Sequence, residues 1–154
     1  MNNSEKENGM SEFVTHSREE TVLLAEKFSK TLKKGDVIAF FGDLGVGKTA
    51  FVSGVSKGLG CLEAYSPTFA IVNDYGGEIP LIHFDMYRIS TWEDLESTGY
   101  FDYLERGAII CIEWSENILN ALPDGYIKIE ITKTENENDR KIVITGANDE
   151  NFSC

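Results

Sequence analysis

The chain has 154 residues, of which 42% are hydrophobic and 11% aromatic, enough to build the core of one domain of ordinary size. Its 26 acidic residues outnumber 14 basic ones, and the formal net charge of −12 argues against a surface that binds a nucleic-acid backbone unaided. Three cysteines and two histidines show no metal-ligand spacing, which argues against a dedicated zinc site.

Polar segments bracket a continuous pattern of apolar residues. We expect residues 1–12 and 147–154 to form flexible tails and residues 13–146 to form a single domain. The acidic start is not typical of a signal peptide, and no apolar run approaches the ~20 residues that cross a bilayer. We therefore expect a cytoplasmic protein with no membrane partner.

The first half of the domain predicts a helix, a strand and a second helix. Ser17 and Glu20 fit a capping box, and apolar residues then recur at helical spacing until residues 33–35, Lys-Lys-Gly, supply a stop. Residues 36–41 form a short apolar run, which predicts a strand buried on both faces. A glycine-rich turn follows, and residues 49–59 again show helical spacing.

The second half predicts five strands and one interrupted helix. The strands are expected at residues 69–72, 81–84, 108–112, 126–131 and 141–144. The glycine-containing segment 73–80 is typical of a hairpin connection between the first two strands, and the alternation in the last two predicts an antiparallel pair. The acidic segment 91–104 predicts a helix interrupted by Gly99. Together these elements predict an α/β domain.

The turn at residues 42–49 matches the phosphate-binding P-loop, in which Gly, four residues, Gly and Lys are followed by Ser or Thr. Glycines let the backbone curl so that its N–H groups point at phosphate oxygens, and the helix that follows adds its positive N-terminal end. Lys48 can reach the β- and γ-phosphates, and Thr49 can offer its hydroxyl to Mg²⁺. The expected nucleotide contacts are Gly42, Asp43, Leu44, Gly45, Val46, Gly47, Lys48, Thr49 and Ala50.

Nucleotide hydrolysis also requires an acidic residue near Thr49 that holds Mg²⁺ or orients water. Two apolar runs end in a carboxylate, at Asp85 and at Glu113. If both strands run parallel to residues 36–41, both carboxylates emerge at the carboxyl edge of the sheet, where α/β proteins bind ligands. A solvated strand end is the alternative for each. For His83, inside the first run, a core histidine with satisfied hydrogen bonds is favoured over a catalytic base.

Three further residues are weaker candidates. Thr68 lies in a loop between the P-loop helix and the next strand, where P-loop switches sense a γ-phosphate, although an ordinary loop threonine is the alternative. Trp114 follows Glu113 and could flank the nucleotide, or simply pack in the core. Arg88 could contact phosphate or a partner, or form an ion pair with a nearby carboxylate such as Asp85.

Three segments that follow the P-loop resemble, in the same order, the TsaE (YjeE) family. They are Ser-Pro-Thr-Phe at residues 66–69, His-Phe-Asp-Met-Tyr-Arg at 83–88 and Ile-Glu-Trp at 112–114. The resemblance extends over about residues 17–124, and TsaE proteins are bacterial ATPases of tRNA threonylcarbamoyladenosine (t6A) biosynthesis. It implies that residues 13–146 form a P-loop ATPase domain, with a mixed sheet flanked by helices and C-terminal antiparallel strands.

The resemblance also implies partners and ligands. An ATP-binding, weakly hydrolysing subunit of this kind works with a TsaB–TsaD pair, which transfers a threonylcarbamoyl group to the adenosine next to the tRNA anticodon. ATP and Mg²⁺ would be its ligands, and tRNA would be reached only indirectly, through the partners. By the same resemblance, Thr68 would lie in a switch-like loop.

Catalytic and binding roles follow from the same motifs. Lys48 and Thr49 would hold phosphate and Mg²⁺, and Glu113 would complete the metal site. Asp85 would be the acidic residue required for hydrolysis, so Lys48, Asp85 and Glu113 are the expected catalytic residues. Thr21, near the start of the first helix, would border the adenine.

Two other interpretations remain open. A small GTPase fits the length and the P-loop, and residues 74–77 satisfy its Asp-x-x-Gly motif, although they fall in the expected hairpin turn. Residues 132–135 approach a guanine-reading Thr-Lys-x-Asp, but Glu135 replaces the aspartate. The other alternative is a nucleotide-gated assembly module, whose function depends on nucleotide binding while hydrolysis is incidental. It differs from the ATPase only in how much hydrolysis contributes.

Overall fold

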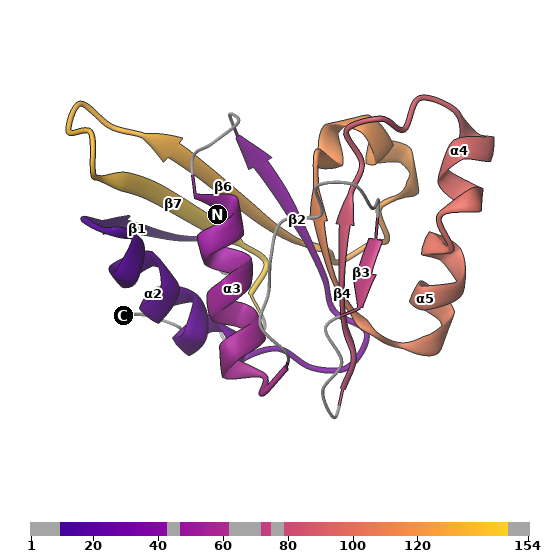
Figure 1. Ribbon diagram of the computed structural model, residues 1–154, viewed down its shortest axis with the longest axis horizontal. Coiled ribbons are helices and arrows are strands. Elements are labelled where there is room, and N and C mark those ends of the chain that lie inside the picture. The colour runs from indigo at the N-terminus through magenta and orange to yellow at the C-terminus, as the bar shows by residue number, and fades with distance from the viewer. Residues whose placement is uncertain (1–9, 43–46, 62–71, 75–78, 148–154) are drawn as a thin grey trace, which may run out of the picture.

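A mixed sheet organises the parts of the chain that this computed structural model describes, residues 10–42, 47–61, 72–74 and 79–147. Within these residues its strand order is β1-β7-β6-β2-β5-β4-β3 (Figure 1). The strands are β1 (Ser11–Thr15), β2 (Val37–Gly42), β3 (Val72–Asp74), β4 (Leu81–Asp85), β5 (Ile109–Glu113), β6 (Ile127–Lys133) and β7 (Arg140–Thr145). The helices are α2 (Arg18–Ser29), α3 (Lys48–Gly58), α4 (Trp92–Ser97), α5 (Tyr100–Arg106) and the 3-10 segment η1 (Ser115–Ala121).

Strand β2 lies inside the sheet and runs parallel to β5 on one side and to β6 on the other. Strand β4 is parallel to β5, and their register places Asp85 opposite Glu113. The carboxyl ends of β2, β4 and β5 therefore meet at one edge of the sheet. This confirms the expected mixed sheet. The parallel strands also meet the condition under which both carboxylates emerge at the same edge.

Antiparallel strands complete both sides of this centre. Strands β6 and β7 form the expected C-terminal antiparallel pair. Strand β3 pairs antiparallel with β4, and here the expected boundary was wrong: Asn73 and Asp74 belong to the strand, not to the hairpin connection. They do so because β4 offers backbone partners at His83 and Ile82. Residues 69–71, the start of the expected strand, lie outside the described residues.

Strand β1 was not expected from the sequence. It pairs antiparallel with β7, with Ser11 opposite Ile144 and Glu12 opposite Val143, although both residues had been assigned to a flexible tail. The strand is short and polar, and it turns only part of its surface toward the core, which gives it a weak sequence signal. Residues 1–9 and 148–154 lie outside the described part of the chain.

Alternate residues of the central strands supply two apolar cores, one on each face of the sheet. Helices α2 and α3 pack side by side over one face (Figure 1), where the core includes Phe28, Phe51 and strand residues such as Ile38. Helices α4, α5 and η1 contribute to the core of the other face, which includes Tyr100 and Phe84. The ring centroids of these two residues lie 5.7 Å apart in an edge-to-face contact. The prediction that helices flank the sheet is therefore confirmed.

The ends of the helices follow local chemistry. The Ser17 side chain caps α2 by accepting a hydrogen bond from the backbone N–H of Glu20 at 3.1 Å, whereas the Glu20 carboxylate accepts from the backbone N–H of His16 at 2.8 Å. Helix α2 ends at Ser29, earlier than the expected stop, because the next three residues form i→i+3 hydrogen bonds instead. Gly99, at a φ of +84°, separates α4 from α5 as the sequence indicated.

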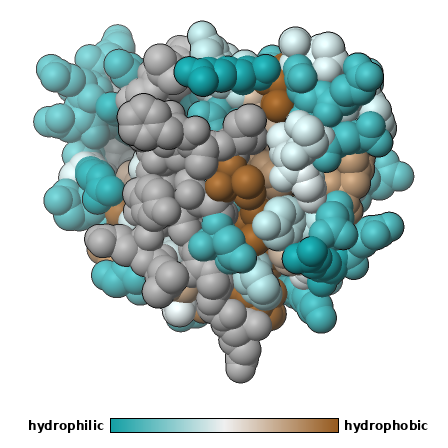
Figure 2. All heavy atoms as spheres, turned by 45° about the vertical axis from the view of Figure 1, so that its right-hand side comes forward, coloured by the Kyte–Doolittle hydropathy of each residue, from teal (hydrophilic) through white to brown (hydrophobic). Residues whose placement is uncertain are grey.

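Hydrophilic side chains predominate on one face of the described surface (Figure 2). Figure 2 brings the side of α4 and α5 forward, and hydrophilic side chains form most of its outline, with hydrophobic ones showing between them in small patches. Across the described residues, none of the helices is both long enough and apolar enough to cross a membrane.

Candidate functional site

The P-loop lies between the end of β2 and the start of α3, at the carboxyl edge of the sheet. Gly47 precedes the helix with a φ of +107°, a left-handed conformation that side chains other than glycine rarely adopt. Gly42 has a φ of +130°, and a Cβ there would meet the backbone of Ile131 on β6. Glycine is therefore required at both ends of the turn. Asp43, Leu44, Gly45 and Val46 lie outside the described residues, so their phosphate contacts stay a prediction.

Lys48 begins α3 and is buried, with only 4% of its surface exposed. Its Nζ donates a hydrogen bond to the Gly42 carbonyl oxygen at 3.1 Å and lies 5.3 Å from the centroid of the Trp114 ring. Trp114 has a φ of +61°, the one positive value at a non-glycine residue in the described chain, and its ring centroid lies 4.9 Å from that of Tyr87. Trp114 is thus placed beside the P-loop lysine, next to the end of β5.

A cavity of about 800 Å³ opens beside the start of α3. It brings together four parts of the chain: the start of α3, the end of β5, the junction of β1 with α2, and the turn between β6 and β7. Its lining residues are His16, Ser17, Arg18, Glu19, Thr21, Gly47, Lys48, Thr49, Ala50, Glu113, Asn138 and Arg140. Of the expected nucleotide contacts, Gly47 to Ala50 and Thr21 therefore meet in one hollow.

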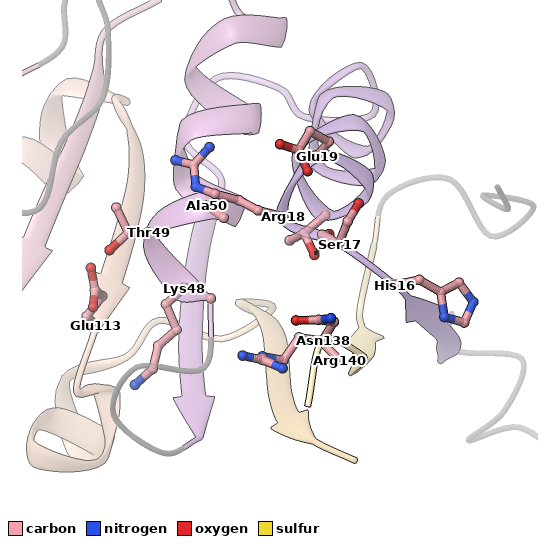
Figure 3. A pocket seen from close by; sticks show the side chains of 12 residues that line it. His16, Ser17, Arg18, Glu19, Lys48, Thr49, Ala50, Glu113, Asn138 and Arg140 are labelled. Atoms are coloured by element: carbon pink, nitrogen blue, oxygen red, sulfur yellow. Dashed lines mark hydrogen bonds between the residues drawn. The ribbon is translucent and has the colours of Figure 1, made fainter. Parts of the chain in front are cut away.

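Thr49 and Glu113 face each other at one end of this cavity, with their oxygen atoms pointing toward one another (Figure 3). The Glu113 Oε2 atom lies 2.7 Å from Nε2 of His83, whose side chain is completely buried. His83 is a buried histidine with a hydrogen-bond partner, as the sequence analysis favoured. The sequence did not indicate that its partner is the candidate metal ligand.

The donor atoms at this end suit Mg²⁺ bound together with a phosphate. Hydroxyl and carboxylate oxygens are ligands that Mg²⁺ prefers, and nucleotide sites commonly hold it by one or two protein groups plus phosphates and water. The described residues contain no group of three or more His, Cys, Asp or Glu side chains that could hold a metal ion by themselves. Thr49 and Glu113 therefore fit a cation that takes its other ligands from a bound nucleotide.

Asp85 lies beside this pair but does not line the cavity. It ends β4 opposite Glu113, and its Oδ1 accepts a hydrogen bond from the backbone N–H of Tyr87 at 3.0 Å. The expected placement of the two carboxylates at the same edge of the sheet is confirmed. The expected role of Asp85 in hydrolysis stays a prediction. Arg88 is exposed, and among the described residues it forms no ion pair with Asp85.

Thr21 also lines the cavity and lies in the first turns of α2. Only 2% of its surface is exposed, and its hydroxyl bonds to the Thr15 hydroxyl at 2.7 Å and to the Ser17 carbonyl at 3.3 Å. These bonds fix the junction of β1 with α2, so the expected adenine contact of Thr21 would be made by its apolar atoms. Thr68, the expected switch residue, lies outside the described residues.

The rest of the cavity wall includes Arg18, Asn138 and Arg140, which no sequence motif indicated. In Figure 3 Arg18 extends from the start of α2 toward α3, while Asn138 and Arg140 come from the β6–β7 turn. His16 Nδ1 joins these two regions through a contact of 2.9 Å with Asp139 Oδ1. This hydrogen bond raises the pKa of His16 above its usual value. The only sequence signal was a polar run between two alternating strands.

Comparison with known proteins gives the family. The sequence matches the family model described as threonylcarbamoyl adenosine biosynthesis protein TsaE over residues 15–142. The chain belongs to the TsaE family. This confirms the resemblance that the three motifs after the P-loop indicated, and it connects the chain with t6A biosynthesis through the family to which it belongs.

Relatives from several bacteria match most of the chain. Proteins named tRNA threonylcarbamoyladenosine biosynthesis protein TsaE include one from Bacillus subtilis, 36% identical over 85% of this chain and 82% of the relative. A Nostoc protein is 38% identical over 90% of this chain and 88% of its own length, and one from Aquifex aeolicus is 35% identical over 88% and 96%. The crystal structure of Bacillus subtilis YdiB has a TM-score of 0.74 at 31% identity, covering 90% of this chain and 86% of that one. The expected P-loop NTPase-like α/β fold is therefore confirmed.

Proposed function

We propose that this protein binds MgATP and hydrolyses it slowly, as a cytoplasmic subunit that supports t6A formation together with a TsaB–TsaD-type pair. One observation carries the proposal: a buried P-loop lysine, Thr49 and Glu113 all line a cavity of about 800 Å³ in a TsaE-family chain. That volume falls within the range of pockets that bind nucleotide-sized ligands.

Each of these groups has a distinct task in the proposal. Lys48 binds the β- and γ-phosphates as a point charge, assisted by the positive N-terminal end of α3. Thr49 and Glu113 would hold Mg²⁺, which would supply positive charge against the negative charge of the terminal phosphates. Asp85, beside Glu113 in the register of β4 and β5, orients the attacking water or the network around it.

The nucleoside occupies the other end of the cavity, near Thr21. This end is formed by the junction of β1 with α2 and by Asn138 and Arg140 of the β6–β7 turn. The segments that favoured a GTPase do not support guanine recognition there, because Thr132 to Glu135 are exposed and do not line the cavity. Asp74 likewise is exposed on β3. We therefore favour ATP.

A reconstituted modification assay tests the proposal directly. Purified TsaB, TsaD, threonylcarbamoyl donor and tRNA are mixed with ATP or GTP, with and without this chain, and t6A is measured over many turnovers. We expect sustained formation only with the chain and ATP, and ATP hydrolysis that rises when the partners are added. Equal t6A formation without the chain would contradict the proposal. Support of t6A formation by ATP binding without hydrolysis would favour the nucleotide-gated assembly module.

A further inference from the structure

A buried hydrogen bond connects the interior of the sheet to the candidate metal site. His83 lies on β4 with none of its surface exposed, and its Nε2 is 2.7 Å from Oε2 of Glu113 on β5. The Glu113 side chain is 13% exposed and lines the cavity. One member of the pair is therefore in the core, while the other reaches the site where the nucleotide is proposed to bind.

The chemistry of the pair sets the direction of this bond. An ionised carboxylate can only accept hydrogen bonds, so the imidazole donates through Nε2. The two side chains are diagonal neighbours on adjacent parallel strands, since His83 is in register with Cys111 and Glu113 with Asp85. Both groups thus project from strands inside the sheet, which are more rigid than loops.

We propose that His83 is a positioning residue that holds the Glu113 carboxylate toward the divalent-cation site beside Thr49. This inference rests on the proposed function. Hydrogen bonding of Oε2 fixes the plane of the carboxylate and so the direction of its other oxygen. Free rotation of the glutamate side chain would otherwise spread that oxygen over several rotamers, and a cation would have to select one of them.

Packing alone does not explain a histidine at this position. The other residues of β4 up to Phe84 are apolar and fully buried, so an apolar side chain would continue the strand without burying a polar ring. A buried polar group is unfavourable unless it is hydrogen-bonded, and its partner here is a residue that faces the cavity. A positioning role accounts for both observations.

Divalent-cation binding measures this role without relying on catalysis. Mn²⁺ serves as the probe in place of Mg²⁺, and its binding to the full chain in the presence of excess ADP is titrated by electron paramagnetic resonance. The variants are His83→Leu, which removes the donor, His83→Gln, whose amide nitrogen can take the place of Nε2, and His83→Asn, whose amide nitrogen lies nearer the position of Nδ1. Circular dichroism and metal-free ADP binding check that each variant is folded.

We expect His83→Leu and His83→Asn to weaken Mn²⁺ binding by about 10- to 100-fold, as is typical when a group that orients a metal ligand is lost. His83→Gln should remain within a few-fold of the wild type, and metal-free ADP binding should be unchanged in all three. If His83→Leu does not fold, the test is the difference in Mn²⁺ affinity between His83→Gln and His83→Asn. Equal Mn²⁺ affinity in the wild type and the folded Leu and Asn variants would overturn the inference, as would a Gln variant no better than Asn.

A double-mutant cycle with Glu113→Gln asks whether His83 acts through Glu113. In the Glu113→Gln background, we expect His83→Asn to cause no further loss of Mn²⁺ affinity. Fully additive losses would contradict the positioning role. Absence of ADP-dependent Mn²⁺ binding in the wild type is a different result, because it would contradict the proposed function on which this inference rests.

Discussion

Lys48 and Trp114 form a cation–π contact, with the lysine Nζ 5.3 Å from the centroid of the indole ring. The same Nζ donates to the Gly42 carbonyl oxygen, so the ammonium group is held at the base of the P-loop by two weak partners. A nucleotide phosphate offers a stronger, charged partner for it. Binding of a nucleotide should therefore change the surroundings of Trp114.

Replacing Lys48 with Met keeps an unbranched chain in the buried position but removes the charge. We expect this variant to bind MgATP about 10- to 150-fold more weakly, which corresponds to losing a charged hydrogen bond worth about 1.5–3 kcal/mol. Fluorescence of Trp114, measured in a Trp92→Phe background, follows the binding because the chain has two tryptophans. Lys57→Met, at an exposed position of the same helix, is the control and should bind normally. Normal MgATP affinity in the Lys48 variant would refute the assignment of the P-loop lysine.

Asp85 and Glu113 should separate in their effects, although the two residues are register neighbours. Glu113→Gln should raise the Mg²⁺ concentration that half-maximal ATPase activity requires, because it weakens the proposed metal ligand. Asp85→Asn should lower turnover by about 10²-fold or more while nucleotide still binds, as expected for a group that orients water. Mg²⁺ titrations of both variants test this division, with the exposed Glu116→Gln as control. The same Mg²⁺ dependence for wild type and Glu113→Gln would show that the division of roles is wrong.

The sequence indicated one end of this site far better than the other. The P-loop and its flanking strand and helix are local in the chain, so spacing and periodicity were sufficient to predict them. The bond between His83 and Glu113 joins residues 30 positions apart, and the contact between His16 and Asp139 joins residues 123 positions apart. Such contacts depend on which strands become neighbours in the sheet, and that information is not contained in any short pattern.

His16 is expected to titrate above its usual range. The hydrogen bond and charge of Asp139, and more weakly the charge of Glu20, raise the pKa of His16 above its ordinary value of 6.5. A raised pKa means that the pair stabilises the folded protein fully below pH 6.5, and that this contribution is lost as the pH rises through the pKa of His16 in the folded state. The link between the start of α2 and the β6–β7 turn should therefore weaken toward alkaline pH.

NMR titration of the histidine ring protons measures this pKa, and His16→Gln assigns the signal because the chain has only two histidines. In Asp139→Asn, the pKa of His16 should fall back toward 6.5, since the main cause of the shift has been removed. The Glu137→Gln variant, which alters a nearby charge but not the bond, should leave it close to the wild-type value. A pKa that does not change in Asp139→Asn would show that the contact is absent in solution.

Helices α2 and α3 approach so closely that Gly54 has no room for a side chain. A Cβ at this position would lie 2.6 Å from Cβ of Ala25 and would also meet the backbone carbonyl oxygen of Val22. We expect Gly54→Ala to lower the free energy of unfolding by about 1–3 kcal/mol, because overpacking outweighs the better helix propensity of alanine. Lys57→Ala, exposed on the same helix, should change it by less than about 0.5 kcal/mol. Urea unfolding measures the free energy of unfolding of both variants. A Gly54→Ala protein more stable than the wild type would contradict the close approach of α2 and α3.

The isolated chain should not bind tRNA. At a net charge of −12, it repels the phosphate backbone, and salt would only screen that repulsion. We expect a Kd weaker than about 10⁻⁴ M at physiological salt, the weak end of ordinary nonspecific binding. Fluorescence anisotropy with labelled tRNA measures it, and the TsaB–TsaD pair serves as the positive control. Micromolar binding that weakens steeply with added salt would reveal a basic surface and contradict this expectation.

Strand β1 pairs with β7, so the first strand in the described part of the chain forms its backbone hydrogen bonds with the last one. During synthesis, β1 leaves the ribosome long before its partner exists, and the contact of His16 with Asp139 cannot form until the β6–β7 turn has emerged. The P-loop and α3, in contrast, are available early. The far wall of the cavity can therefore close only after the β6–β7 turn has emerged, so a nascent fragment that stops before this turn lacks part of the cavity wall.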